Sequence, residues 1–264
     1  MFLLKPFKII FEHRYIIKST TLSDIRTKYA GSLLGLFWLL LYPLLLLAAY
    51  SVVYIFIFSV RFGTMSSLEY VLLIFSGLIP FLGYNEALAA SIPSVSANSA
   101  LVKNTLFPID VLPIKAVFVS QCTQAVGMLI LLLALLITGK LTHFAFLLIP
   151  VWFFQVLLSI GVGWFLSALN IFFKDLQNIV TLISIFLMMV SPIAYTVDMI
   201  PTALQPFLKL NILYYFIVSY QDCLVIGYFP RDNVLLYLIV ISLVMFTGGY
   251  WFFNKMKIIF SDNL

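Results

Sequence analysis

Residues 23–43 read SDIRTKYAGSLLGLFWLLLYP, and this stretch decides the fold class of the chain. The basic side chains of Arg26 and Lys28 end abruptly, and no charged residue follows from Tyr29 to Val60, which is 32 positions. A helix needs about 20 apolar residues to cross the hydrocarbon core of a membrane. The sequence therefore predicts that a membrane-spanning helix begins here, with its basic entry on the cytoplasmic side.

The composition of the whole chain agrees with this stretch. Hydrophobic residues make up 63% of the 264 positions and charged residues 9%, whereas a soluble domain carries roughly 25% charged residues. This excludes a soluble globular protein and a disordered one. The apolar runs are long and unbroken, so we expect an all-α integral membrane protein with room for six transmembrane helices and no sizeable soluble domain.

The apolar runs predict six spans, at residues 33–58, 70–92, 116–138, 144–173, 176–195 and 234–253. Residues 1–30 have apolar positions at helical spacing, which predicts an amphipathic segment in the membrane interface, interrupted at Ser19, Thr20 and Thr21 and restarting at a cap formed by Ser23 and Asp24. Prolines, glycine and charges divide residues 196–233 into pieces too short to span, which predicts re-entrant or interfacial outer helices. We expect one transmembrane domain over 1–264, with the bundle over 31–260.

The distribution of basic residues orients the predicted spans. The net charge is +5, and eleven of the 15 Lys and Arg residues fall on one side of this topology: Lys5, Lys8, Arg14, Lys18, Arg26, Lys28, Lys103, Lys115, Lys174, Lys255 and Lys257. The positive-inside rule makes that side cytoplasmic. We therefore predict a multi-pass protein of the cytoplasmic membrane with both termini inside and no nucleic-acid partner.

Glu86 is the one acid well inside a predicted span. A charge near the middle of a membrane costs about 2.5–3.5 kcal/mol, so Glu86 must be neutral, paired, close to an interface or facing water. One interpretation is a structural hydrogen bond, and the other is a polar residue that lines a substrate path.

Small residues recur at helical spacing in two places. Gly31 and Gly35 form a GxxxG pair, and Ser159, Gly163 and Ser167 place a small residue at every fourth position. Such faces let helix backbones approach closely, within one chain or between subunits.

Motifs for chemistry are missing from the sequence. It contains no GxxxxGK[ST] phosphate loop, and its two histidines, His13 and His143, fall on opposite sides of the predicted membrane. It also offers no intramembrane cluster of carboxylates or histidines for a metal, a proton relay or hydrolysis. We expect that the chain is not an enzyme and carries no metal or cofactor of its own.

Four segments together resemble the permease subunits of ABC exporters that move lipid-linked polysaccharides. They are the entry at 26–43, in which Arg26, Tyr29, Ser32, Gly35 and Trp38 recur every three residues before Pro43; LVKNTLFPIDVLP at 101–113; LNIFFKDLQNIV at 169–180; and SPIAYTVDMIP at 191–201. The likeness covers nearly the whole chain. It implies export of an O-antigen, capsule or teichoic-acid type of polymer, as in lipopolysaccharide biosynthesis at the inner membrane.

The resemblance also implies partners and site residues. The permease would be a homodimer above two copies of an ABC ATPase, which would bind ATP and Mg²⁺. Segment 99–110 resembles the coupling helix, with contacts from Lys103, Asn104, Phe107, Pro108 and Asp110 and a second contact at Lys174 and Asp175. The anionic head group of a polyprenyl-linked glycan would meet Arg26 and Lys28 beside Tyr29, then Arg14 and Lys18, with Glu86 on the path. The alternative is that these cations only set topology and bind anionic lipid.

Three other functions compete with this prediction. An ABC exporter of a drug or small lipid would share the six-span plan. An ion-coupled or proton-coupled secondary transporter would need buried ionisable groups, which are scarce here. A membrane enzyme acting on polyprenyl lipids would need a catalytic constellation that the sequence does not contain.

Overall fold

The computed structural model describes residues 4–53, 66–103, 107–197, 200–231 and 233–260, and every element in these ranges is helical. The four longest α-helices are α4 (Ser67–Ser91), α6 (Val111–Ile137), α7 (Leu148–Asn170) and α11 (Val234–Met256). The others are α1 (Lys5–Glu12), α2 (Arg14–Tyr29), α3 (Trp38–Ser51), α5 (Ser99–Lys103), α8 (Leu176–Val190), α9 (Gln205–Leu208) and α10 (Ile212–Gln221). Short 3-10 turns extend several of these helices, and a π-helical turn, Asp222–Ile226, extends α10.

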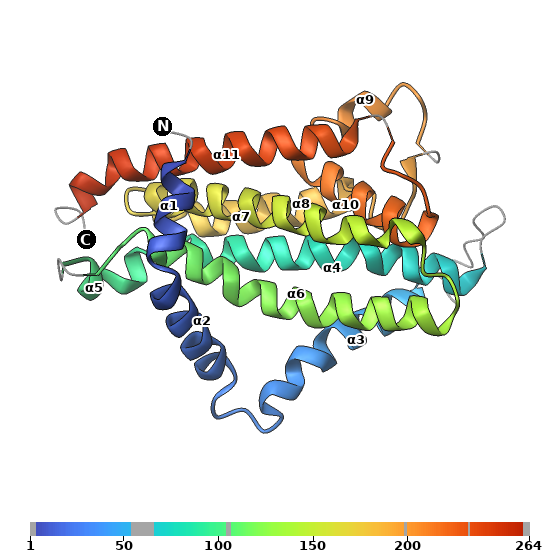
Figure 1. The fold of residues 1–264 in the computed structure, drawn as a ribbon, viewed down its shortest axis with the longest axis horizontal. Helices are drawn as coiled ribbons and strands as arrows, with labels where there is room; N and C mark the ends of the chain where they lie inside the picture. The colour runs from blue at the N-terminus through green and yellow to red at the C-terminus, as the bar shows by residue number, and fades with distance from the viewer. Residues whose placement is uncertain (1–3, 54–65, 104–106, 198–199, 232, 261–264) are drawn as a thin grey trace.

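The long helices run side by side along the long axis of the molecule (Figure 1). With their 3-10 extensions they are 25 to 28 residues long, and each is long and apolar enough to cross a membrane. They match the predicted second, third, fourth and sixth spans to within a few residues, which confirms a helical, multi-pass membrane protein.

The first and fifth predicted spans appear as shorter helices. The described helix of the first span covers Gly35–Ser51, and α8 covers Leu176–Val190. At 1.5 Å per residue these 17 and 15 residues reach about 26 and 22 Å, less than the roughly 30 Å of a hydrocarbon core. The end of the first predicted span lies outside the described residues, so the count of six spans stays a prediction.

Two glycines allow the backbones of α7 and α11 to approach closely. A methyl group added at Gly249 would lie 2.0 Å from the carbonyl oxygen of Gly161, and one added at Gly161 would lie 2.3 Å from the carbonyl oxygen of Met245. Larger residues at either position would separate the helices. In the small-residue series of α7, Gly163 likewise accommodates Ser91 of α4, so part of the predicted small face serves packing within the chain.

The N-terminal segment is helical as predicted, but its break is elsewhere. α1 ends at Glu12, and after His13 α2 continues through Ser19, Thr20 and Thr21 without interruption, so the predicted break and restart were wrong. The Thr20 hydroxyl donates to the carbonyl of Ile16 at 2.7 Å, which satisfies the side chain within the helix.

The first small-residue pair does not lie on a helix face. Gly31 and Gly35 belong to the turn between α2 and α3, which we call the elbow (residues 30–37), and their φ angles are 78° and 50°. Because residues with a side chain rarely adopt these angles, the glycines allow the chain to reverse direction here. The prediction of a helix-packing GxxxG motif was wrong.

The segment between the last two predicted spans forms α9, α10 and the π-helical turn, all too short to span. α10 is largely buried, with Phe216, Ile217 and Tyr220 inaccessible to solvent. Its first turn is capped by Asn211, whose side-chain oxygen accepts from the amide of Leu213 at 2.9 Å. Whether these pieces enter the membrane from outside stays a prediction.

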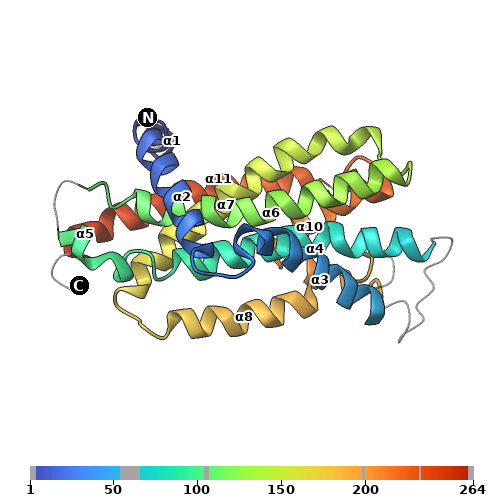
Figure 2. The ribbon, with the colours of Figure 1, turned by 90° about the horizontal axis from the view of Figure 1, so that it is seen from below.

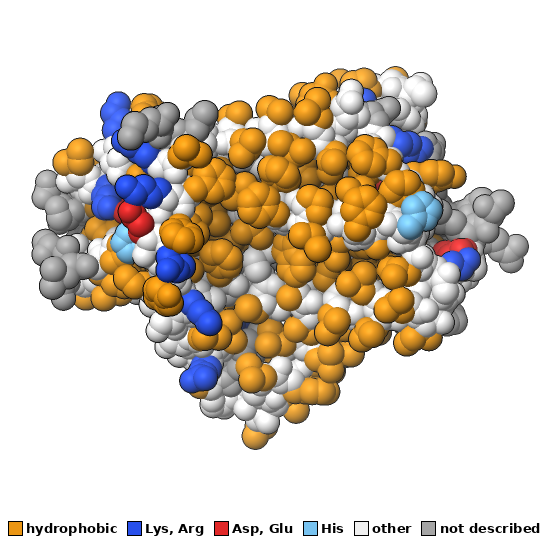
Figure 3. Space-filling model, in the orientation of Figure 1, with side chains coloured by type: hydrophobic (Ala, Val, Ile, Leu, Met, Phe, Trp, Pro, Cys, Tyr) orange, Lys and Arg blue, Asp and Glu red, His pale blue; other side chains and the backbone are white. Residues whose placement is uncertain are grey.

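One end of the bundle, which we call the basic end, carries α1, α5, the turn between α7 and α8, and the end of α11 (Figures 1 and 2). Lys and Arg side chains gather over α1 and α2 on the face shown in Figure 3, and hydrophobic side chains cover the middle of the bundle. α1 crosses one side of the bundle, whereas α8 lies on the opposite side (Figure 2).

Candidate functional site

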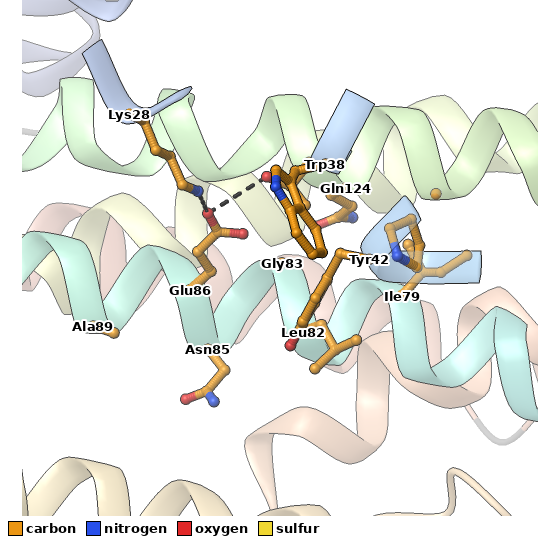
Figure 4. A pocket seen from close by; sticks show the side chains of 13 residues that line it. Lys28, Trp38, Tyr42, Ile79, Leu82, Gly83, Asn85, Glu86, Ala89 and Gln124 are labelled. Carbon is orange, nitrogen blue, oxygen red and sulfur yellow. Dashed lines mark hydrogen bonds and ion pairs between the residues drawn. The ribbon is translucent and has the colours of Figure 1, made fainter. Parts of the chain in front are cut away.

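A cavity of about 400 Å³ lies between the elbow and the bundle (Figure 4). α4 and α6 form its floor, and the end of α2 and the start of α3 form its other wall. Its lining combines one cation, one carboxylate, two aromatic side chains and several uncharged polar groups: Lys28, Glu86, Trp38, Tyr42, Asn85, Thr123 and Gln124.

Lys28 and Glu86 form an ion pair across this cavity (Figure 4). The side chains are 40% and 30% exposed, and the Thr123 hydroxyl donates to the same carboxylate at 3.4 Å. Glu86 is therefore paired with a cation rather than isolated, which resolves the cost expected of a lone charge within a span. Both side chains are partly exposed and line the cavity, so a charged ligand in the cavity can reach the pair.

The elbow places two aromatic side chains opposite α4. Trp38 Nε1 donates to the Ser32 hydroxyl at 3.1 Å, which fastens the first turn of α3 to the elbow. Tyr42 follows four positions later on the same helix face. Both line the cavity, and they are 39% and 49% exposed.

Buried amides fix the floor of the cavity. Gln124 and Gln155 exchange hydrogen bonds of 2.9 and 3.0 Å, and Gln155 also donates to the carbonyl of Pro80 and accepts from the Tyr220 hydroxyl. Gly83 makes this approach possible, because a methyl group there would lie 2.0 Å from Gln124 Oε1. Satisfied polar groups of this kind are tolerated in an apolar core, whereas unpaired ones are costly.

This arrangement is suited to binding rather than to bond cleavage. An ammonium group attracts a phosphate, exposed aromatic faces can stack on sugar rings, and side-chain amides bond to hydroxyl groups. Among the described residues, no three His, Cys, Asp or Glu side chains come together as a metal site.

The other predicted head-group residues do not line the cavity. Arg26 and Lys18 are exposed on α2, and Arg14 lines a separate groove beneath α1. The side chain of Tyr29 lies outside the described part of the structure. The structure thus brings together two of the predicted residues, Lys28 and Glu86.

The predicted coupling residues lie at the basic end. Lys103 ends the short helix α5 and is exposed, as are Lys174 and Asp175 in the turn before α8. Phe107 and Pro108 are half-buried, and Asn104 lies outside the described residues. A short helix, α5, therefore lies within segment 99–110, which resembles the coupling helix.

Asp110 occupies a different environment from the other predicted coupling residues. It is buried, its carboxylate pairs with Lys257, and its carbonyl accepts from Trp164 Nε1 at 3.0 Å. These bonds tie the segment to α7 and to the end of α11. A direct contact from the Asp110 side chain to a partner stays a prediction.

Sequence reasoning missed the polar groups around Lys28 and Glu86. Thr123, Gln124 and Gln155 carry no charge and stand in otherwise apolar runs, so they did not interrupt the predicted spans. The available signal was the presence of amides in a hydrophobic helix, which implies that each has a partner.

Comparison with known proteins places the chain in a family. The family model described as "ABC-2 type transporter" matches residues 17–225. The O-antigen export system permease protein RfbA of Klebsiella pneumoniae is 29% identical over 254 residues, 92% of this chain and 93% of that protein. The protein of the same name from Myxococcus xanthus is 23% identical over 258 residues, 97% of each chain. The polysialic acid transport protein KpsM of Escherichia coli is 26% identical over 238 residues, 88% of this chain and 90% of that protein. Because the family model covers most of its length, the chain belongs to the ABC-2 type transporter family.

Proposed function

We propose that this chain is the permease subunit of an ABC exporter that moves a lipid-linked cell-surface polysaccharide, of O-antigen, capsule or teichoic-acid type, across the cytoplasmic membrane. The relatives named for O-antigen export and polysialic acid transport align with about nine tenths of the chain. The observation in the structure that carries the proposal is the cavity that Lys28, Trp38 and Tyr42 line together. A cation beside aromatic faces fits a phosphate attached to a sugar.

The proposed topology has six spans and both termini in the cytoplasm. The basic end of the bundle supports this orientation, because Lys and Arg concentrate on cytoplasmic segments. α3 and α8 would be the remaining two spans, and α9 and α10 would form re-entrant helices on the outer side. α1 and α2 would lie in the cytoplasmic interface, in keeping with their position across the bundle (Figures 1 and 2).

The proposed assembly is a homodimer with two copies of a separate ABC ATPase, which binds ATP and Mg²⁺. In this assembly the chain is a transport subunit and not an enzyme. α5 and the turn at Lys174 and Asp175 support such docking, because their exposed charged groups lie together at the basic end. ATP binding would shift the spans only if the ATPase contacts this end differently in its two states.

Within this scheme Lys28 exchanges partners during transport. The lipid-linked phosphate would displace Glu86 from Lys28, while the first sugars would lie against Trp38 and Tyr42. The pair lines the cavity and is partly exposed, so a charged phosphate that forms charge-assisted bonds to Lys28 can replace it. Arg26 would attract the head group from the exposed face of α2.

The test combines depletion with complementation. In cells depleted of the protein, lipid-linked glycan should accumulate inside while surface glycan disappears, and the wild-type gene should restore export. Lys28→Gln should restore little export. Lys255 is an exposed lysine near the end of α11 and outside the cavity, so Lys255→Gln should restore export fully. If surface glycan is unaffected by depletion, the chain has another cargo.

A charge exchange separates a binding role of Lys28 from a structural one. The double variant Lys28→Glu, Glu86→Lys keeps an ion pair across the cavity but moves the cation from α2 to α4. If the pair only stabilises the fold, the double variant exports normally and the binding role fails. If Lys28 receives the phosphate, the double variant folds, is present at normal levels and remains defective.

A further inference from the structure

A second, almost wholly apolar groove of about 760 Å³ lies under α1, on the side of the bundle opposite α8. Phe11 and Arg14 line it from the junction of α1 and α2, Phe118 lines it from α6, and Trp152 and Phe153 line it from α7. It shares no lining residue with the cavity around Lys28, and α6 lies between the two.

The length of this groove matches one leaflet of a membrane. Its α7 wall extends from Ile149 to Ile160, which is 12 residues and 11 steps of 1.5 Å, or about 16 Å of helix. Half of a hydrocarbon core of roughly 30 Å is about 15 Å. One lipid chain that enters beside α1 would thus reach the middle of the membrane along α7.

The described walls of the groove present no unpaired polar group to a lipid acyl chain. Gln121 is the one uncharged polar side chain in the lining. Its oxygen accepts from Trp152 Nε1 at 2.7 Å, and its nitrogen donates to the Ser120 hydroxyl at 3.3 Å. Exposed apolar side chains such as Phe11 and Phe153 complete the surface.

A positively charged group stands at the mouth of the groove. Arg14 is exposed, and its guanidinium lies 4.4 Å from the ring centre of Phe11 and 4.7 Å from that of Tyr15. It donates to the carbonyl of Phe11 at 3.0 Å, and none of the ion pairs among the described residues involves it. Glu12, the nearest acid in sequence, pairs with Lys8 at 3.5 Å.

We propose that this groove binds an anionic phospholipid of the surrounding leaflet, with one acyl chain along α7 and the phosphate against Arg14. Charge complementarity selects an anionic head group, and an arginine holds a phosphate with paired, charge-assisted bonds. The lipid fills the space between α1 and the two long helices and so fastens the interface segment to the bundle. Arg14 is thereby assigned to a structural lipid rather than to the cargo.

The experiment uses fluorescence quenching in vesicles. The full-length protein is reconstituted in phosphatidylcholine, and brominated phosphatidylglycerol is titrated in. The signal of Trp152 is isolated as the difference between the wild type and Trp152→Phe, since the other three tryptophans remain in both proteins. We expect saturable quenching by brominated phosphatidylglycerol at low mole fraction, and by brominated phosphatidylcholine only in proportion to its abundance.

Variants of the arginine test the head-group contact. Arg14→Gln should weaken the saturable quenching about fivefold, as expected for the loss of one basic residue at a membrane surface, and Arg14→Lys should retain most of it. Lys255→Gln removes a positive charge from the end of α11, outside the groove, and should change nothing. Equal quenching by both lipids, or equal binding by Arg14→Gln and wild type, overturns the proposal. Because no cargo is present, the result is independent of the proposed export function.

Discussion

Replacing Gly249 with alanine should weaken the contact between α7 and α11 more than any comparable change on the surface of α11. The added methyl carbon would lie 2.0 Å from the Gly161 carbonyl oxygen and 3.0 Å from Gly161 Cα. Ordinary van der Waals contact begins near 3.4 Å, so the backbones must move apart by about 1.4 Å (3.4 minus 2.0). Forcing a methyl group into a packed interface costs about 1–3 kcal/mol, and a clash with backbone falls at the upper end of that range.

The neighbouring residue supplies the control. Gly248 is exposed, and a methyl group there would have no neighbour within 4 Å. Gly248→Ala should leave stability unchanged or raise it by up to about 1 kcal/mol, because alanine favours the helix over glycine. The two variants have identical composition and differ only in the helix face that carries the methyl group.

The assay is unfolding of the purified protein in mild detergent by increasing sodium dodecyl sulfate, followed by loss of helical circular dichroism. We expect Gly249→Ala to be about 1–3 kcal/mol less stable than Gly248→Ala, which is the packing cost alone, because the gain in helix preference is common to both variants. If the two variants unfold at the same midpoint, the close approach of α7 and α11 does not limit stability and the packing argument is refuted.

Three further substitutions test other contacts with the same unfolding assay. Gln155→Leu removes the acceptor of the buried Tyr220 hydroxyl and should cost about 1–3 kcal/mol; a fully stable variant would show that the buried amides are not needed. Lys257→Met leaves the buried Asp110 carboxylate without its ion pair and should also cost about 1–3 kcal/mol; an unchanged midpoint would show that this ion pair does not limit stability. Gly35→Ala forces a side chain into a positive φ of 50° and should cost about 1 kcal/mol, although space around it is open; an unchanged midpoint would show that the elbow adapts freely.

The long spans were predictable because charge-free apolar runs of sufficient length have few alternatives in a membrane protein. α4, α6, α7 and α11 begin and end within five residues of their predicted bounds. The break in the N-terminal segment was not predictable from Ser19, Thr20 and Thr21, because hydroxyl side chains can bond back to the helix that contains them. The elbow glycines were misassigned for a related reason, since glycine suits both a close helix contact and a left-handed turn.

The candidate site was predictable in its charged members and not in its geometry. Lys28 and Glu86 attracted attention separately, one as the last cation before the first apolar run and the other as an acid within a span. Their pairing joins positions 58 residues apart and depends on how the elbow folds back against α4. Gln124 contributes through a partner on α7, and no local pattern records such a contact.

The close contact of α7 and α11 also has a consequence for synthesis. Gly161 and Gly249 are 88 residues apart, so at about 5–20 residues per second a ribosome needs about 4–18 s to make the second after the first. During that interval the backbone surface at Gly161, against which Gly249 later packs, is not covered by α11. Of the four long helices that the structure describes, α11 is made after the other three, so its contact with α7 forms only once those three have been synthesised.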